Sequence, residues 1–154
     1  MNLRVNVHAT CVRLGRQGVL LLGKSGAGKS DLALRLIGRG AVLVSDDRCE
    51  LSVERNRLVA RAPRAIAGLL EVRGVGIVQL DHAPLAAIAL AVDLSGRIER
   101  MPEIPHYAPP KPLDLPRSAQ PRLIALNAFE SSAPEKIAAA LLRQTGRRAP
   151  VKRN

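Results

Sequence analysis

Eight consecutive residues have the types and the spacing of a phosphate-binding loop (P-loop). The pattern G-x-x-x-x-G-K-[ST] is matched at every fixed position by Gly23, Lys24, Ser25, Gly26, Ala27, Gly28, Lys29 and Ser30. Glycines let the backbone take positive φ angles, so that the loop N–H groups can point at an anion from close by. Lys29 supplies a full positive charge for the β- and γ-phosphates, and the Ser30 hydroxyl is a ligand for Mg²⁺. The loop therefore predicts a site for a nucleotide with its metal ion.

Two adjacent aspartates are the second chemical signal. Asp46 and Asp47 follow Ser45 at the end of an apolar run, 41–44, that is typical of a buried strand. A Mg²⁺–nucleotide site needs a carboxylate near the metal, and a kinase acting on a hydroxyl needs a base near the acceptor. We expect one aspartate to face Ser30 and the metal, directly or through water, and the other to face the substrate. An acidic turn without chemistry is the alternative.

Four further polar residues allow both a functional and a structural interpretation. His8 is either a surface residue on a strand or a group that touches phosphates or a nearby acid. Asp31 suits the positive end of a helix, or it is a partner for His8. Glu71 and Arg73 are either an exposed ion pair, or a second metal ligand together with a group that orients the acceptor or a phosphate.

The elements around the P-loop fit its requirements. Residues 19–22 read as a buried strand, 31–37 as a helix stopped by Gly38 and Gly40, and 41–44 as a second strand, which implies a parallel crossover. Residues 3–14 read as strand that turns at 15–18 into the strand before the loop. Further on, we expect a hairpin (49–53 with 58–60), strands at 88–94 and 123–126, and a strand or loop margin at 75–80. A proline-rich irregular loop spans 101–121, and a capping box at Ser132 starts a helix over 135–143.

Composition limits the class of protein. The chain has 154 residues and is 47% apolar, which fits one globular domain with a real core. It has no apolar run long enough to span a membrane and no signal-peptide core, so we expect a cytoplasmic protein without a membrane partner. Cys11 and Cys49 lack metal-ligand spacing and read as small buried residues. The net charge of +11 suggests nucleic acid, but two aromatic residues give poor stacking platforms, and we favour a solvated basic tail.

Four features occur in a fixed order along the chain. His8 stands well upstream of the P-loop, and the loop is followed by Val44-Ser45-Asp46-Asp47-Arg48, which is similar to V-A-D-D-R. Residues 70–77, with the sequence LEVRGVGI, are similar to L-E-I-R-G-L-G-I, a highly specific signature. Together these features resemble the HPr kinase/phosphorylase family, bacterial serine kinases that phosphorylate the phosphocarrier protein HPr or its relatives. The resemblance covers residues 3–100 well and the remainder weakly.

The resemblance implies an α/β fold of the P-loop kinase type related to phosphoenolpyruvate carboxykinase, with a mixed sheet and flanking helices. The catalytic domain is expected over 1–146 and a basic tail over 147–154, as a short form without the family's usual N-terminal domain. The family implies a hexamer, ATP and Mg²⁺, and an HPr-like phosphocarrier of the phosphotransferase system as partner. The implied residues are the P-loop for ATP, Ser30, Glu71 and Asp46 for Mg²⁺, and His8, Lys29, Asp47 and Arg100 for catalysis, with Asp47 as the base.

The sequence also departs from the family's pattern. Asp31 replaces the usual glutamate after the loop serine, which shortens its reach toward His8. The P-V-R-P-G-R loop tied to phosphorylase activity has no clear counterpart, and 115–121 is only a weak echo of it. We therefore expect kinase activity more than the reverse reaction. A small-molecule kinase, a nucleotide-sensing module without chemistry and a basic nucleic-acid binder remain the rival hypotheses.

Overall fold

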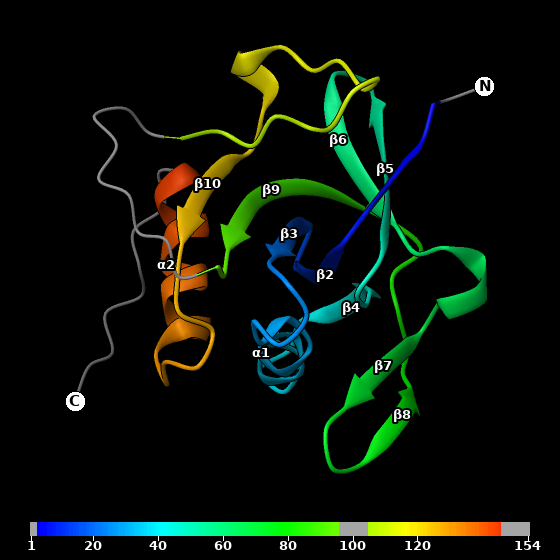
Figure 1. Ribbon diagram of the computed structural model, residues 1–154. Coiled ribbons are helices and arrows are strands. Elements are labelled where there is room, and N and C mark those ends of the chain that lie inside the picture. Colours follow the sequence, from blue (N-terminus) through cyan, green and yellow to red (C-terminus); the bar gives the residue numbers. More distant parts are fainter. Residues whose placement is uncertain (1–2, 96–104, 146–154) are drawn as a thin grey trace.

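A curled mixed sheet carries the site. The computed structural model describes residues 3–95 and 105–145, and within these ranges an eight-stranded sheet has the order β1-β5-β6-β9-β3-β2-β4, with β10 paired to β9 (Figure 1). Its strands are β1 Val5–Val7, β2 Ala9–Leu14, β3 Gln17–Leu22, β4 Val42–Ser45, β5 Cys49–Glu54, β6 Arg57–Arg61, β9 Ala86–Asp93 and β10 Arg122–Ala125. The helices are α1 Lys29–Ile37 and α2 Ala133–Thr145, with 3₁₀ turns η1 Arg64–Ile66 and η2 Arg117–Ala119. β7 Leu69–Val72 and β8 Gly76–Gln79 form a separate hairpin.

The predicted crossover connects two strands that point the same way but are not neighbours. β3 leads through the P-loop and α1 to β4, while β2 lies between β3 and β4 and is antiparallel to both. On its other side β3 is parallel to β9, which is parallel to β10. β2 therefore occupies the position next to β3 where the sequence pattern alone places β4.

Both faces of the sheet are buried, which explains its apolar runs. Alternation along β3 sends Val19 and Leu21 to the face covered by α1 and α2, and Leu20 to the opposite face. The opposite core includes residues of β5 and β6, and also Leu113 and Leu115 from the proline-rich segment. The described part of that segment, 105–121, thus packs onto the core through two buried leucines rather than forming only a surface loop.

Glycines with positive φ angles flank α1, Gly28 before its first residue and Gly40 after its last turn. It buries Leu32, Ala33 and Leu36 against the sheet. After its last turn, Gly40 takes a φ of 102°, and the N–H of Ala41 donates to the carbonyl of Leu36 at 3.1 Å. That bond reverses the chain into β4, as the predicted stop requires.

Several predicted elements differ from the observed ones. The stretch 3–14 is not one strand: it is interrupted at His8, so that β1 pairs with β5 while β2 pairs with β3. The hairpin 49–53 with 58–60 is confirmed as β5 and β6. The segment 75–80, predicted as a strand or loop margin, contains the strand β8, which pairs with β7, a strand that the sequence pattern did not predict. β9 starts at Ala86, two residues before the predicted start, and α2 is longer than 135–143 at both ends.

The α/β class with a mixed sheet and flanking helices is confirmed. α2 starts directly after Ser132, whose carbonyl accepts the N–H of Lys136 at 2.9 Å. Both cysteines are buried, as predicted. In the part of the chain that the structure describes, no helix is long and apolar enough to cross a membrane. The predicted basic tail, 147–154, lies outside the described residues.

Candidate functional site

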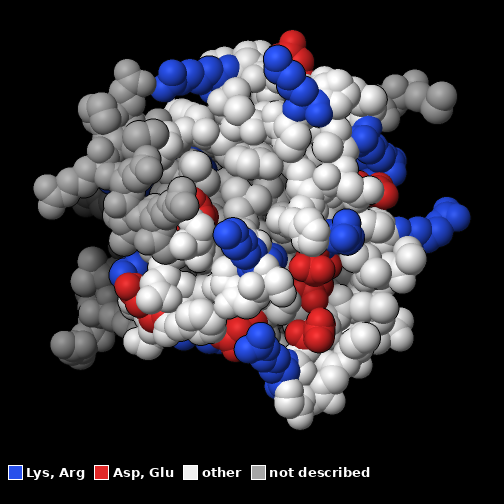
Figure 2. Space-filling model, in the orientation of Figure 1, with Lys and Arg blue, Asp and Glu red and all other residues white. Residues whose placement is uncertain are grey.

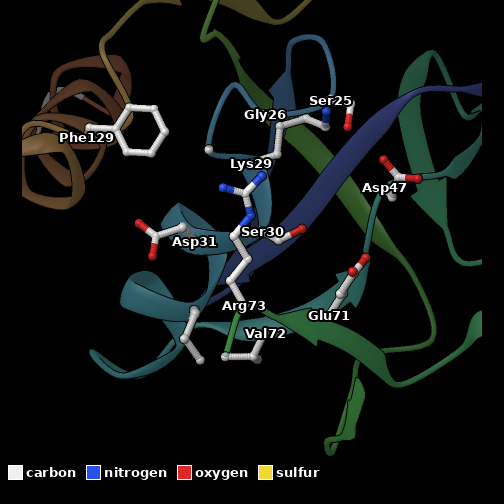
Figure 3. A pocket seen from close by; sticks show the side chains of 12 residues that line it. Ser25, Gly26, Lys29, Ser30, Asp31, Asp47, Glu71, Val72, Arg73 and Phe129 are labelled. Carbon is white, nitrogen blue, oxygen red and sulfur yellow. The ribbon is translucent and has the colours of Figure 1, made fainter. Parts of the chain in front are cut away.

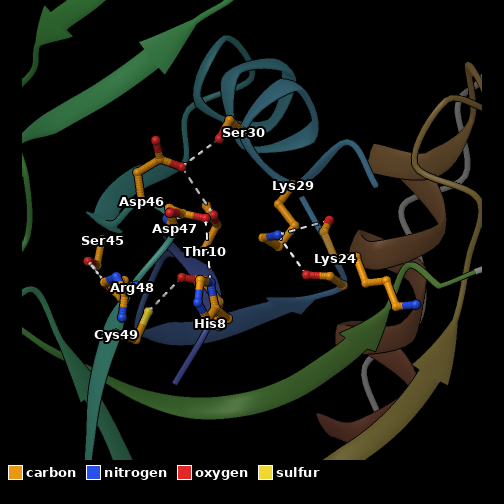
Figure 4. A network of polar contacts seen from close by, with 12 residues as sticks. His8, Thr10, Lys24, Lys29, Ser30, Ser45, Asp46, Asp47, Arg48 and Cys49 are labelled. Carbon is orange, nitrogen blue, oxygen red and sulfur yellow. Dashed lines mark hydrogen bonds and ion pairs between the residues drawn. The ribbon is translucent and has the colours of Figure 1, made fainter. Parts of the chain in front are cut away.

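The P-loop has the backbone of an anion cradle. Gly28 precedes α1 with a φ of 93°, and Gly26 has a φ of 86°, so both lie in the left-handed region. A Cβ at Gly28 would lie 2.8 Å from the Cβ of Ala128, so no larger residue fits there. The Lys29 ammonium donates to the carbonyls of Gly23 at 2.7 Å and Lys24 at 3.2 Å, and only 5% of the residue is exposed (Figure 4). The loop thus holds its lysine folded over its own backbone, where a bound polyphosphate would take over that charge.

Asp46 joins three segments at the bottom of the site. Its Oδ1 accepts hydrogen bonds from the hydroxyls of Ser30 at 2.7 Å and Thr10 at 3.1 Å, and its Oδ2 accepts the N–H of Glu71 at 3.1 Å. The residue is 7% exposed, so this carboxylate is buried and satisfied by its partners. The predicted contact between one aspartate and Ser30 is confirmed. Because the Ser30 hydroxyl donates a hydrogen bond to Asp46, the lone pairs of its oxygen stay free for a metal ion.

Asp47 points away from that network. Its backbone has a φ of 65°, and its N–H donates to the hydroxyl of Thr10 at 3.0 Å. The side chain is 59% exposed, and Oδ1 lies 3.9 Å from Nδ1 of His8, whose side chain is 64% exposed. The sharp turn therefore directs two neighbouring carboxylates to different environments, one buried against Ser30 and one exposed (Figure 4).

A cavity of about 400 Å³ opens between the P-loop, α1 and β7. Figure 3 shows that Glu71 and Asp47 lie on one side of it, Asp31 and Phe129 on the other, and that Arg73 extends between them from the end of the β7 strand. Its lining residues are Ser25, Gly26, Gly28, Lys29, Ser30, Asp31, Leu34, Asp47, Glu71, Val72, Arg73 and Phe129. The cavity thus combines a phosphate cradle with the predicted acidic residues.

The charges in this region, both acidic and basic, suit a polyphosphate that binds together with a metal cation. Figure 2 shows Lys and Arg side chains interspersed with acidic ones, which gather below the centre of this face. The cavity itself contains the carboxylates of Asp31, Asp47 and Glu71 beside the cations of Lys29 and Arg73. Among the described residues there is no cluster of three or more His, Cys, Asp or Glu side chains that could hold a metal ion. Mg²⁺ typically takes one or two carboxylates plus phosphate oxygens and water, so Ser30 and Glu71 fit the protein's share of such a shell.

The structure brings most of the predicted site residues together. His8, Lys29, Ser30, Asp46, Asp47 and Glu71 all lie at or next to the cavity. The suggested pair of Asp31 with His8 is wrong, because Asp31 Oδ2 lies 3.2 Å from Nε of Arg35, one turn along α1. Arg100 lies outside the described residues, so its catalytic role stays a prediction.

Two residues of the site were missed from the sequence. Thr10 accepts the Asp47 N–H and donates to Asp46, which fixes the turn between the two aspartates. Phe129 lines the cavity although it follows the P-loop by a hundred residues. Thr10 belongs to no recognisable motif, so the sequence gives no signal for it. Phe129 could have been found, because it is the chain's one phenylalanine and stands next to a loop segment.

The two buried thiols lie behind the site rather than in it. Burial raises the pKa of Cys49 to about 12 and the pKa of Cys11 well above its ordinary value. The charges of Asp46 and Asp47 add to the rise in the pKa of Cys49, and the neighbouring Cys49 adds to the rise in the pKa of Cys11. The Cys49 Sγ is 3.3 Å from the carbonyl oxygen of Ala9. Both cysteines therefore stay protonated and act as small core residues.

Comparison with known proteins agrees with this geometry. The family described as HPr Serine kinase C-terminal domain matches residues 1–84, more than half of the chain. A protein of Caldicellulosiruptor bescii named HPr kinase/phosphorylase is 46% identical over 80 residues, covering 51% of this chain and 26% of that protein. One of the same name from Thermoanaerobacter sp. is 37% identical over 110 residues, covering 68% and 35% respectively. The chain thus matches only a quarter to a third of the length of these relatives.

The fold has a solved counterpart. The structure of the Hpr(Ser) kinase/phosphatase from Coxiella burnetii superimposes with a TM-score of 0.69 at 21% identity, covering 92% of this chain and 90% of that one. At this level of identity the likeness establishes the arrangement of the elements, and the chemistry must be argued from the side chains.

Proposed function

Because the chain belongs to the HPr serine kinase family, we propose that it is an ATP- and Mg²⁺-dependent kinase for a serine of HPr or an HPr-like phosphocarrier. The observation that carries this proposal is that the two neighbouring aspartates lie in different environments. Asp46 is buried on the P-loop Ser30, while Asp47 is exposed on the same cavity as Lys29. A phosphate cradle with a free carboxylate at one side is what transfer to a hydroxyl needs.

Binding would use the P-loop first. The loop N–H groups and the start of α1 would hold the β- and γ-phosphates, and Lys29 would exchange its two carbonyl partners for phosphate oxygens. Ser30 and Glu71 would hold the metal ion, and Asp46 would orient Ser30 by accepting a hydrogen bond from its hydroxyl. When bound, Mg²⁺ would neutralise phosphate charge. Arg73, which lines the cavity, adds a second cation for the acceptor or the nucleotide.

Transfer would depend on Asp47. The serine hydroxyl attacks the γ-phosphorus, its proton passes to the Asp47 carboxylate, and the bond from the γ-phosphorus to the bridging oxygen breaks to leave ADP. The exposure of Asp47 suits a base that must meet a protein side chain from outside. His8, 3.9 Å away, is placed to hold the carboxylate in position. In the reverse direction, with inorganic phosphate attacking phosphoserine, the protonated Asp47 would act as the acid.

The setting of this reaction is part of the same proposal. We propose a cytoplasmic enzyme that assembles as a homo-oligomer, a hexamer by family resemblance, and that acts in a bacterial phosphotransferase system. Arg100 is proposed as a further catalytic cation. Nucleic acid and membranes are not proposed as partners.

The test is incubation with γ-labelled ATP, Mg²⁺ and several purified HPr-like carriers, followed by identification of the labelled residue. Phosphoserine on a carrier is the expected result, with Lys29→Met as the inactive control. ATP binding without serine labelling on any carrier would contradict the proposal. Label appearing on a small metabolite instead would point to a small-molecule kinase.

A further inference from the structure

An exposed aromatic ring stands over the P-loop. Phe129, in the connection from β10 to α2, is 66% exposed and is the only phenylalanine of the chain. A Cβ at Gly28 would lie 3.1 Å from Cζ of Phe129, so the edge of the ring is directly above the end of the loop. Leu34, which is also exposed, lines the cavity from α1, three residues after Asp31 and so on the same face of that helix. Exposed large apolar side chains in a polar cavity indicate a ligand with an apolar face.

The ring is held in place by bonds to the backbone around it. The Arg35 guanidinium donates to the carbonyl of Glu130 at 3.0 Å and also to that of Ala128, the residues on either side of Phe129. The N–H of Phe129 itself donates to Oδ1 of Asn127 at 3.0 Å. Arg35 is in turn fixed by Asp31 on the same helix. This network anchors the connection on α1, so the ring keeps its place without being buried.

The ring lies at the opposite end of the cavity from the transfer site. Figure 3 shows Asp47 and Glu71 on one side, Phe129 and Asp31 on the other, with the P-loop and Arg73 between them. A triphosphate that presents its γ-phosphorus to Asp47 and lies along the P-loop must extend its nucleoside away from Asp47. Its base then reaches the side of the cavity where Phe129 and Leu34 are exposed.

We propose that Phe129 is the stacking platform for the base of the nucleotide, with Leu34 as a further apolar residue of the same cavity. The inference rests on the proposed function, because it uses the direction in which the triphosphate lies. Every base has a flat π-face that stacks on an aromatic ring, so the platform adds affinity without selecting strongly among bases. A protein acceptor is a poorer occupant, since it must approach the far side, where Asp47 is exposed.

The experiment compares ATP with inorganic tripolyphosphate, which has the phosphates but no base. Affinities of both, with Mg²⁺, are measured by calorimetry for the wild-type chain, Phe129→Ala, Phe129→Tyr and the control Leu85→Ala. Leu85 is an exposed apolar residue outside the cavity. Phe129→Ala should weaken ATP about 5- to 150-fold and leave tripolyphosphate within about twofold. Phe129→Tyr, which keeps a ring, and Leu85→Ala should leave both ligands within about threefold.

Three results would overturn the platform. ATP affinity unchanged in Phe129→Ala would show that no base rests there. An equal loss for ATP and tripolyphosphate would show that the ring only shapes the P-loop. Unchanged ATP affinity with a raised KM for the carrier would assign the ring to the protein substrate. A wild-type chain that binds ATP but phosphorylates no carrier would contradict only the proposed function. The role of Phe129 is tested by the affinities for ATP and tripolyphosphate, which do not depend on phosphorylation.

Discussion

Replacing Asp46 tests whether its buried carboxylate stabilises the fold. Asp46→Ala removes the acceptor for Thr10, Ser30 and the backbone N–H of Glu71. A buried donor left without a partner costs about 1–3 kcal/mol, and the two hydroxyl bonds are worth about 1 kcal/mol each. The free energy of unfolding should therefore fall by about 3–5 kcal/mol, equivalent to a Tm lower by about 6–20 °C for a chain of this size. Asp46→Asn keeps the shape but turns an amide N–H₂ toward one of the donors, and should cost about 1–3 kcal/mol.

The assay is urea unfolding followed by circular dichroism, with Asp47→Asn as the matched control. Asp47 is exposed, and among residues 3–95 and 105–145 the ion pair of its side chain is the one with His8 at 3.9 Å. Because Asn also tolerates the φ of 65°, this variant should change stability by less than about 0.5 kcal/mol. The reasoning would be refuted by an Asp46→Ala chain as stable as Asp47→Asn. In that case the buried carboxylate would not be what joins β2, α1 and β7.

Three further predictions follow from single side chains. Lys29→Met removes the cation that the P-loop holds on its own carbonyls, and should lower kcat/KM for carrier phosphorylation by about 10²–10³-fold in a steady-state assay. Glu54 has a lowered pKa, chiefly because Arg61 and then Ser52 bond its carboxylate, so its stabilisation is present above its unfolded pKa and is lost as pH falls through the lower folded pKa. Between about pH 6 and pH 3, wild type should lose more unfolding free energy than Glu54→Gln, and equal losses would contradict this origin of the shift. Cys49, with its pKa raised to about 12, should resist thiol reagents at neutral pH in the folded chain and react in concentrated urea, and rapid native labelling would contradict its burial.

The sequence predicted the parts of the site that are local. The P-loop, the helix after it and the two aspartates are each specified by neighbouring residues, and the structure places Asp46 on Ser30 as expected. The hairpin of β5 and β6 was equally readable from its turn, Glu54 to Arg57. In these cases the same few residues determine both the element and its chemistry.

What the sequence could not predict depends on distant contacts. β2 lies between β3 and β4 because of pairing with both, which no local pattern records. His8 lies between β1 and β2. Asp31 pairs with Arg35, one turn along α1, rather than with His8. Phe129 reaches the P-loop in a connection that is held to α1 by Arg35 and packed into the core through the buried Ala128. Leu113 and Leu115 look like part of an irregular segment, yet they complete the core on one face of the sheet.

Single-turnover phosphorylation of a purified HPr-like carrier by Asp47→Asn tests the central claim most directly. The variant removes the base and keeps the fold, the P-loop and the Asp46 network. The account predicts ATP affinity within about threefold of wild type and a rate of serine phosphorylation lower by at least about 10²-fold. Transfer at the wild-type rate, with ATP bound as before, would contradict the assignment of Asp47 as the group that takes the serine proton.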